Sequence, residues 1–214
     1  MKNALLIGCG SKWGADFTRY LLTKNYHIDL ITSSDNFSGT PNVNPHKVDW
    51  QQYTGPVVDT IFENLSQKTY DLIFFNQNGG GGPNNEWFRP NCMFSEDSWA
   101  DILKRDSMMS YRLVHKLTNS INKSTKVGWM LTGLIDGKDP NHWGYAGYGS
   151  MKSMHLFIMR GFASAHPGIF FAINPIWFPK GDEVKDAEAI LNVIEKLEPK
   201  DNGKTFNKDG STWI

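Results

Sequence analysis

The sequence predicts an α/β fold in which a doubly wound parallel sheet carries helices on both faces, in three α/β/α layers. Short apolar runs alternate with segments of helical periodicity along nearly the whole chain. Glycines, asparagines or hydroxyl residues follow the runs, and ligands bind at the carboxyl ends of parallel strands. The chain has 214 residues, of which 40% are hydrophobic, enough for one sizeable core. We therefore expect residues 1–214 to form a single domain.

Composition limits the classes of partner. Lys plus Arg and Asp plus Glu number 22 each, so no basic excess exists to bind nucleic acid or an anionic membrane, and small molecules are the expected partners. The apolar run at residues 4–7 is too short for a signal peptide or a membrane span. Cys9 and Cys92 do not suggest a disulfide framework, which favours a cytoplasmic location. The six histidines lack metal-ligand spacing, so we expect no metal.

The expected elements follow from these periodicities. Strands are predicted at residues 3–8, 27–32, 47–49, 71–75, 127–131 and 169–174. Helices are predicted after the first strand, from Pro56, and at residues 95–119, 145–165 and 185–197. Residues 38–45 contain glycine and two prolines and have no helical period, so we expect a loop there in place of a crossover helix.

A glycine-rich turn joins the first strand to the first helix. It comprises Gly8, Cys9, Gly10, Ser11, Lys12, Trp13 and Gly14. A strand, a glycine turn and a helix N-terminus together form a phosphate site, because backbone N–H groups and the helix dipole point at the anion. A plain tight turn is the alternative interpretation.

The ends of the next strands supply further candidate contacts to a dinucleotide. Ser33 and Ser34, helped by Lys12, suit a 2′-phosphate and favour NADP over NAD, whereas Asp35 argues for NAD. Asp49 either accepts from an adenine amino group or is a capped surface aspartate. The fourth strand ends in Asn76-Gln77-Asn78-Gly79, followed by three more glycines, which indicates close backbone approach to a ligand.

Tyr148 and Lys152 form the most distinctive pair in the sequence. In a helix they stand one turn apart on the same face, so an ammonium lies beside a phenol. Such an arrangement suggests an acid–base pair, and a surface pair is the alternative interpretation of the spacing alone.

In this order, the motifs resemble those of the short-chain dehydrogenase/reductase family over nearly the whole chain. Gly10 and Gly14 match part of its glycine turn, with Asp16 at the place of the third glycine. The other matching motifs are Asp49, Asn76-Gln77-Asn78-Gly79 and Tyr148-x-x-x-Lys152. The ending, Asn202-Gly203-Lys204-Thr205-Phe206 with Asp209-Gly210-Ser211-Thr212-Trp213, resembles the C-factor-like carbonyl reductases.

This resemblance implies a Rossmann-type NAD(P)-binding domain that transfers a hydride between nicotinamide and a small carbonyl or alcohol substrate. Tyr148 would be the general acid/base, and Lys152 would stabilise its phenolate and hold the nicotinamide ribose. The family's serine falls at Gly133, or at Thr132 after a shift of one residue. Asp106 falls at the family's helix asparagine. Pro175, at the end of the last strand, completes the expected cofactor contacts.

Two consequences of the resemblance remain open. The family pairs its two long central helices into a four-helix bundle, which implies a homodimer or homotetramer through residues 97–119 and 145–165. The replacements at Asp106 and Gly133 leave an alternative, a non-catalytic nucleotide-binding regulatory or partner-binding protein with a degenerate site.

Overall fold

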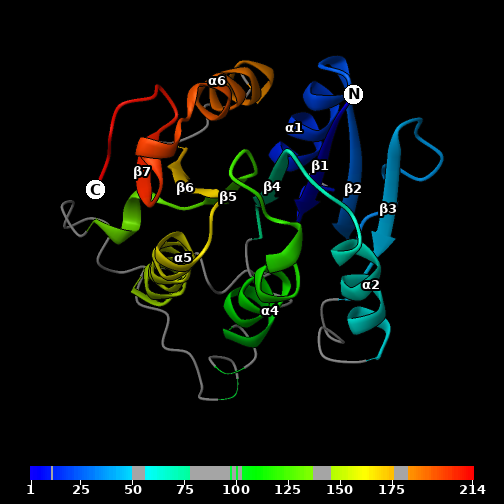
Figure 1. The fold of residues 1–214 in the computed structure, drawn as a ribbon, viewed down its shortest axis with the longest axis horizontal. Coiled ribbons are helices and arrows are strands. Elements are labelled where there is room, and N and C mark those ends of the chain that lie inside the picture. The colour runs from blue at the N-terminus through cyan, green and yellow to red at the C-terminus, as the bar shows by residue number, and fades with distance from the viewer. Residues whose placement is uncertain are drawn as a thin grey trace.

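The computed structural model describes residues 1–10, 12–49, 56–77, 97, 100, 103–136, 146–175 and 183–214. Within these residues seven parallel strands form one sheet in the order β3-β2-β1-β4-β5-β6-β7 (Figure 1). The strands are β1 (Lys2–Ile7), β2 (Tyr26–Thr32), β3 (Val43–Lys47), β4 (Leu72–Phe75), β5 (Lys126–Met130), β6 (Ile169–Asn174) and β7 (Lys204–Asn207).

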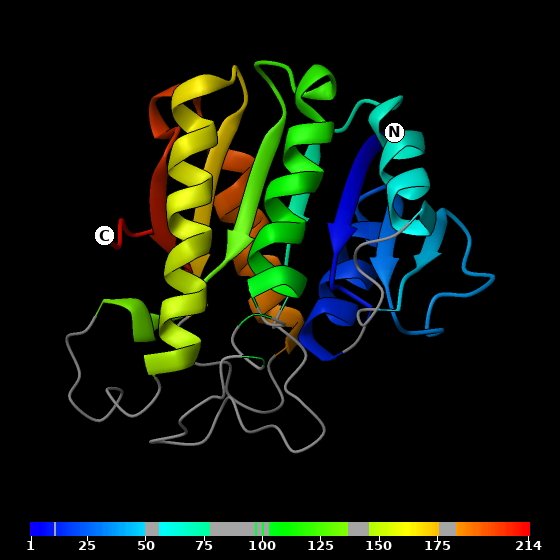
Figure 2. The same ribbon diagram turned by 90° about the horizontal axis from the view of Figure 1, so that it is seen from below.

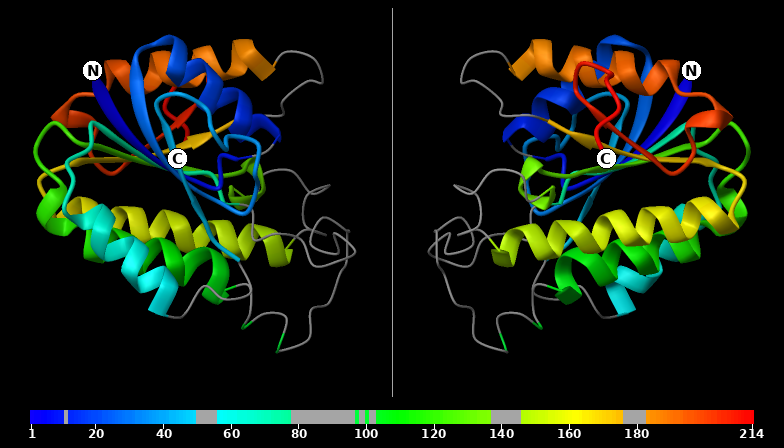
Figure 3. Two further views of the ribbon diagram at one scale, coloured as in Figure 1. Left: turned by 90° about the vertical axis from the view of Figure 1, so that its right-hand side faces the viewer. Right: turned by 90° about the vertical axis from the view of Figure 1, so that its left-hand side faces the viewer.

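Helices cover both faces of this sheet (Figures 2 and 3). α1 (Lys12–Thr23) and α6 (Glu183–Lys196) lie on one face, and α2 (Pro56–Ser66), α4 (Met109–Lys116) and α5 (Ala146–Ala165) lie on the other. Shorter turns are the π-helical η3 (Leu103–Met108) and the 3₁₀ turns η4 (Thr118–Ser120), η5 (Gly133–Ile135) and η7 (Pro199–Asp201). The predicted three-layer α/β/α fold is confirmed. No helix in the described parts of the chain is long and apolar enough to cross a membrane.

The strand register brings the candidate site together. Ile7 pairs with Ile31 of β2 and Phe75 of β4, and Phe75 pairs in turn with Trp129 of β5. The carboxyl ends of these strands therefore lie along one edge of the sheet. The glycine turn, Asn76 and the residues after β5 and β6 all emerge at that edge, as expected for a parallel sheet.

The prediction for the third strand was wrong. It was placed at residues 47–49, but β3 spans Val43–Lys47 and includes residues assigned to the loop. Pro45 is tolerated because β3 is an edge strand, where a missing N–H breaks no bond to a further strand. Val48 still donates its N–H to the Thr32 carbonyl, so the chain follows β2 past the strand end. The prediction that no helix joins β2 to β3 is confirmed, since turns precede Val43.

Two other elements differ from the predictions. Most of the first eight residues of the helix predicted at 95–119 lie outside the described residues; from residue 103 the structure has the π-helical turn η3 followed by α4, which ends at Lys116. The final strand, β7, was not predicted, because four residues carry too short a pattern and pair only with distant β6.

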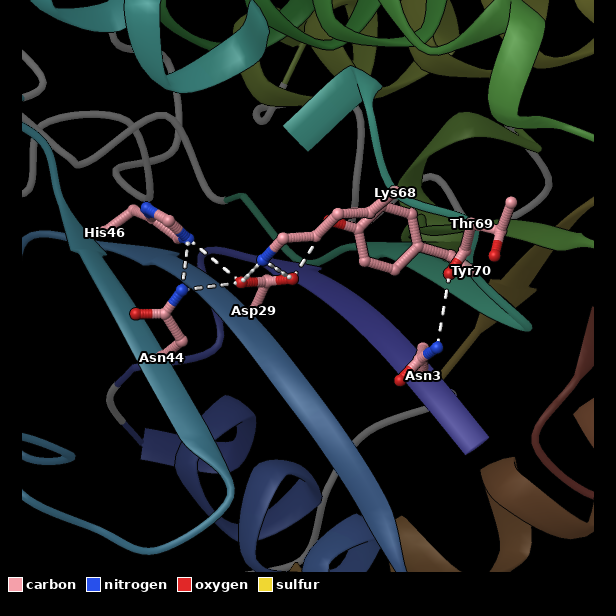
Figure 4. Close-up of polar contacts among 7 residues, drawn as sticks. All are labelled: Asn3, Asp29, Asn44, His46, Lys68, Thr69 and Tyr70. Atoms are coloured by element: carbon pink, nitrogen blue, oxygen red, sulfur yellow. Dashed lines mark hydrogen bonds and ion pairs between the residues drawn. The ribbon is translucent and has the colours of Figure 1, made fainter. Parts of the chain in front are cut away.

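A buried carboxylate joins β2, β3 and the segment before β4. Asp29 is 2% exposed and accepts hydrogen bonds from Lys68 at 2.8 Å, Asn44 at 2.9 Å and Tyr70 at 3.0 Å, with His46 Nε2 at 3.1 Å (Figure 4). Burial alone would raise the pKa of Asp29, but the hydrogen bonds from His46, Lys68 and Asn44 and the Lys68 charge lower it well below its usual range.

We expect the substitution Asp29→Asn to reduce the free energy of unfolding at pH 7 by about 1–3 kcal/mol, because it removes a buried, charge-assisted network. A depressed carboxyl pKa contributes stability above the unfolded value, near ~4, that is lost as pH falls further. The free energy of unfolding, measured with urea, should therefore change less between acidic and neutral pH in the variant than in the wild type. Asp35→Asn is the control, because its exposed pair with Lys47 should contribute below about 0.5 kcal/mol. Equal losses for the two variants would contradict the role of burial.

Candidate active site

The glycine turn packs tightly against the ends of its neighbouring strands. A Cβ on Gly10 would lie 1.9 Å from Thr32 Oγ1, and one on Gly14 would lie 2.6 Å from the Cys9 Cα. Gly8 donates its N–H to the Ile31 carbonyl and accepts from Asn76 Nδ2. Glycine at these positions therefore lets the backbone pack closely against the ends of β2 and β4 just before and within the first turn of α1, the kind of helix N-terminus at which phosphate groups bind.

Trp13 and the nearby Asp16 both contact other side chains of α1. Trp13 is buried and stacks on Phe17 with ring centroids 5.1 Å apart, so its ring belongs to the core. Ser11 and the Lys12 side chain lie outside the described residues. Asp16 pairs with Arg19 at 2.7 Å, which compensates the charge that would oppose a pyrophosphate.

The end of β2 is tied to the glycine turn. Thr32 Oγ1 accepts from the Ser34 N–H at 2.9 Å, Ser34 Oγ accepts from the Asn36 N–H, and Asn36 Nδ2 donates to the Gly10 carbonyl at 2.9 Å. Ser33 is exposed. The Asp35 carboxylate is paired with Lys47 at 2.8 Å, a cation that the sequence analysis did not consider for this site. Asp49 is exposed just beyond β3.

The segment after β4 connects the turn to α5. Asn76 donates its N–H to the Ile7 carbonyl at 2.8 Å. The carbonyl of the next residue, Gln77, accepts from the Lys152 ammonium, and its side-chain oxygen accepts from Ser110 Oγ at 2.7 Å. Gln77 was not predicted as a site residue, because it contacts Lys152 through its backbone carbonyl and not through its side chain. Asn78 and Gly79 lie outside the described residues.

Tyr148 and Lys152 lie in the first turns of α5 and are both buried. The Lys152 ammonium lies 5.8 Å from the centroid of the Tyr148 ring. Burial, reinforced by the Asp106 carboxylate, raises the pKa of Tyr148. Burial lowers the pKa of Lys152, and Asp106 opposes that change. The expected pairing of phenol and ammonium on one helix face is present.

Asp106 lies in the π-helical turn η3 and has no exposed surface. One of its carboxylate oxygens is 3.9 Å from Lys152 Nζ and 3.6 Å from Nε2 of His155, a buried residue that the sequence analysis did not single out. His155 follows Lys152 by one helical turn, and this spacing was the signal available in the sequence. A π-helical turn is often found at functional sites.

Thr132 and Gly133 lie where β5 ends. Thr132 caps η5, and its hydroxyl accepts from the Leu134 N–H at 3.5 Å. Leu134 packs on the cluster formed by Tyr148 and Met151, so η5 contacts the start of α5. A Cβ on Gly133 would lie 3.7 Å from Asn174 Nδ2, which is an ordinary van der Waals contact. Pro175 is half-buried directly after β6.

Neither a metal cluster nor a reactive thiol occurs in the described part of the chain. No group of three or more His, Cys, Asp or Glu side chains there is arranged to hold a metal ion. Cys9 is free and buried, and burial raises the pKa of its thiol. Cys92 lies outside the described residues.

No protein-family model and no curated protein matches this sequence. Solved structures do match along the chain. A carbonyl reductase from Pseudomonas aeruginosa in complex with NADP has a TM-score of 0.81 and 14% identity, covering 100% of this chain and 99% of its own. The fold is that of short-chain dehydrogenases.

Two further solved structures support this assignment of the fold. The NADPH-bound carbonyl reductase from chicken fatty liver has a TM-score of 0.76 and 14% identity, covering 100% of this chain and 99% of its own. A short chain dehydrogenase family protein from Francisella tularensis has a TM-score of 0.72 and 16% identity, covering 98% of each chain. The resemblance drawn from the sequence is thus confirmed for the fold.

We expect Gly14→Ala to destabilise the protein by about 1–3 kcal/mol, because its methyl group would overlap backbone at Cys9 and displace the turn. Gly161→Ala in α5 is the control, since a Cβ there meets nothing within 4 Å. It should raise stability by about 0.5–1 kcal/mol. Thermal unfolding measures both effects. A Gly14→Ala variant that behaves like Gly161→Ala would contradict the tight packing of the turn.

Proposed function

We propose that this chain is an NAD(P)-dependent oxidoreductase of the short-chain dehydrogenase type, which reduces a small carbonyl compound or oxidises the corresponding alcohol. One observation carries the proposal. The Lys152 ammonium is buried at the carboxyl edge of the sheet, bonded to the Gln77 carbonyl and beside the Tyr148 ring. Burying a cation is costly unless partners or function require it. We further propose that residues 1–214 act as one cytoplasmic domain.

The residues at this edge fit a nicotinamide dinucleotide. The glycine turn offers backbone N–H groups at the N-terminus of α1, and the hydroxyls of Ser33 and Ser34 follow β2 beside it. The Asp35 carboxylate, which would favour NAD, is engaged by Lys47, so NADP is the favoured cofactor. NADP or NADPH is bound in both carbonyl reductase structures described above. When bound, the cofactor supplies or accepts the hydride.

Tyr148 suits the role of proton donor to a carbonyl oxygen. The phenol is protonated at neutral pH, but burial raises its pKa, so loss of the proton requires a nearby positive charge that stabilises the phenolate. Lys152 stabilises the phenolate that remains, and its other N–H groups suit the ribose hydroxyls. The Thr132 hydroxyl, next to the turn that packs on Tyr148, is the proposed second contact to the substrate oxygen. Asp106 acts through Lys152, and Asn76 and Pro175 border the cofactor site.

We expect Tyr148→Phe to bind NADPH with unchanged affinity but to lose about 10²–10⁴-fold in turnover, because the phenol proton is removed while the ring remains. Calorimetric titration measures binding, and NADPH consumption over a panel of aldehydes and ketones measures turnover. Tyr111→Phe, on the exposed side of α4, is the matched control and should change neither quantity. Unchanged turnover in Tyr148→Phe would refute the assigned role, and failure to bind both NADPH and NADH would refute the function.

A second candidate is a non-catalytic nucleotide-binding regulatory protein. Two observations favour it: the Asp106 carboxylate lies 3.9 Å from Lys152 and offsets its charge, and Gly133 carries no hydroxyl. The same measurements separate the candidates. Binding of NADPH without turnover of any carbonyl in the panel would favour this second function.

We also propose that the protein is a homodimer or homotetramer assembled through α4 and α5. Met108 and Tyr111 at η3 and α4 are exposed by 48% and 46%, and Phe157 on α5 by 74%. Met154, one turn before Phe157, is also exposed. The two helices lie side by side on the same face of the sheet, so these apolar side chains suit a helix-to-helix contact with a second copy (Figure 2).

We expect Phe157→Glu to convert the oligomer to a monomer, because a carboxylate would be buried without a partner at the contact. Light scattering after gel filtration measures the mass. Val57→Glu on α2, where the valine is 68% exposed, is the matched control and should leave the mass unchanged. A wild-type protein that is already monomeric at micromolar concentration would contradict the proposed assembly.

A further inference from the structure

The side chains of Asp106, Lys152 and His155 lie together near Tyr148, and none of the three residues is more than 1% exposed. Asp106 Oδ2 is 3.9 Å from Lys152 Nζ and 3.6 Å from His155 Nε2, so one carboxylate oxygen faces both basic groups. Lys152 has a second partner in the Gln77 carbonyl, and Ser110 Oγ binds both the Gln77 side chain and the Asp106 backbone carbonyl. The positions of all these groups are fixed by α5, η3, α4 and the end of β4.

The hydrogen bonding of this cluster is incomplete. Among the described residues, neither carboxylate oxygen of Asp106 and neither ring nitrogen of His155 has a partner at normal hydrogen-bond geometry. Buried polar groups without partners are rare, and each requires an explanation. A small rotation would bring the imidazole within hydrogen-bond distance of the carboxylate, since 3.6 Å is only slightly long.

We propose that His155 is a positioning residue for the Tyr148–Lys152 pair: its neutral imidazole donates Nε2–H to Asp106 and holds that carboxylate away from the Lys152 ammonium. This role rests on the proposed function for its catalytic consequence. When Asp106 is hydrogen-bonded to His155, its carboxylate compensates the positive charge of Lys152 less than it would in direct contact with Lys152 alone. The ammonium therefore remains available to Tyr148.

The charges that face His155 agree with a neutral imidazole. Asp106 from η3 and Lys152 from α5 are the charged groups that act on it among the described residues, and Gln77 and Ser110 nearby are neutral. Burial lowers the pKa of His155 to about 4; the Asp106 carboxylate opposes this, Lys152 reinforces it, and contact with the Asp106 backbone opposes it weakly. At neutral pH the ring therefore carries one proton, which it can donate to the carboxylate.

Removal of the imidazole has a defined consequence. In His155→Leu the Asp106 carboxylate keeps Lys152 as its one cationic partner and closes on it. The ammonium then stabilises the phenolate less, so the proton of Tyr148 is held more tightly. His155→Gln keeps an N–H donor and should restore the wild-type state. Asp106→Asn removes the charge that His155 controls, so a further His155→Leu substitution should have no effect in that background.

The first test is nitrogen NMR of the imidazole in the full-length wild-type protein. We expect a neutral Nε2–H tautomer for His155 at pH 7 that becomes protonated only near pH 4. An Nδ1–H tautomer, or an imidazolium at pH 7, would overturn the proposal. This experiment needs no variant that alters the cluster, so it holds even if His155→Leu does not fold.

The second test measures the acidity of residue 148 directly. Replacing Tyr148 by 3,5-difluorotyrosine brings the phenol into a measurable pH range, and fluorine NMR follows its titration. We expect His155→Leu to raise the pKa of the phenol by about one unit, and His155→Gln to leave it unchanged. Leu156→Ala, which only removes apolar volume from the next position of α5, should also leave it unchanged.

The outcomes separate this proposal from the proposed function. An unchanged or lowered pKa in His155→Leu, or an equal rise in the Asp106→Asn background, would overturn the role of His155. Failure of the wild-type protein to bind NADPH and NADH in calorimetric titration would instead refute the oxidoreductase function, and neither NMR measurement depends on turnover.

Discussion

The burial of the Lys152 ammonium is the constraint on which the site depends. An ammonium without water needs acceptors close by, and the chain supplies the Gln77 carbonyl in direct contact and the Asp106 carboxylate at 3.9 Å. These two acceptors come from the end of β4 and from η3, while the lysine comes from α5. A single buried charge therefore fixes the relative positions of a strand end, a π-helical turn and the helix that carries Tyr148.

The same burial decides the protonation of Tyr148. Loss of water raises the pKa of the phenol, and the carboxylate of Asp106 adds to that effect. Both effects hold the proton on the phenol more tightly, and the positive charge of Lys152 acts in the opposite sense. An asparagine at position 106 would leave the lysine charge unopposed. The carboxylate in this chain thus gives His155 a charge to control, which an amide would not.

The parts of the site that local pattern specifies were predictable. The helical spacing of Tyr148 and Lys152 predicts that these two side chains meet, the glycines after β1 predict the turn, and alternating apolar segments predict the layers of the fold. The rest depends on contacts between distant residues. Edge position explains why Pro45 lies in a strand, pairing with β6 explains β7, and the Gln77 contact is made by backbone that no side chain signals. The sequence around His155 does not show that η3 brings the Asp106 carboxylate to within 3.6 Å of its imidazole.

Two buried aspartates in this fold, Asp29 and Asp106, differ in the hydrogen bonds that their carboxylates accept. Asp29 is surrounded by donors from Lys68, Asn44 and Tyr70, with His46 alongside, so its charge is fully compensated and it stabilises the sheet edge. Asp106 is more deeply buried, yet its oxygens lack hydrogen bonds among the described residues. A structural carboxylate gains from every added donor. The Asp106 carboxylate instead lies 3.9 Å from the Lys152 ammonium and 3.6 Å from the His155 imidazole, so its interactions depend on those two side chains.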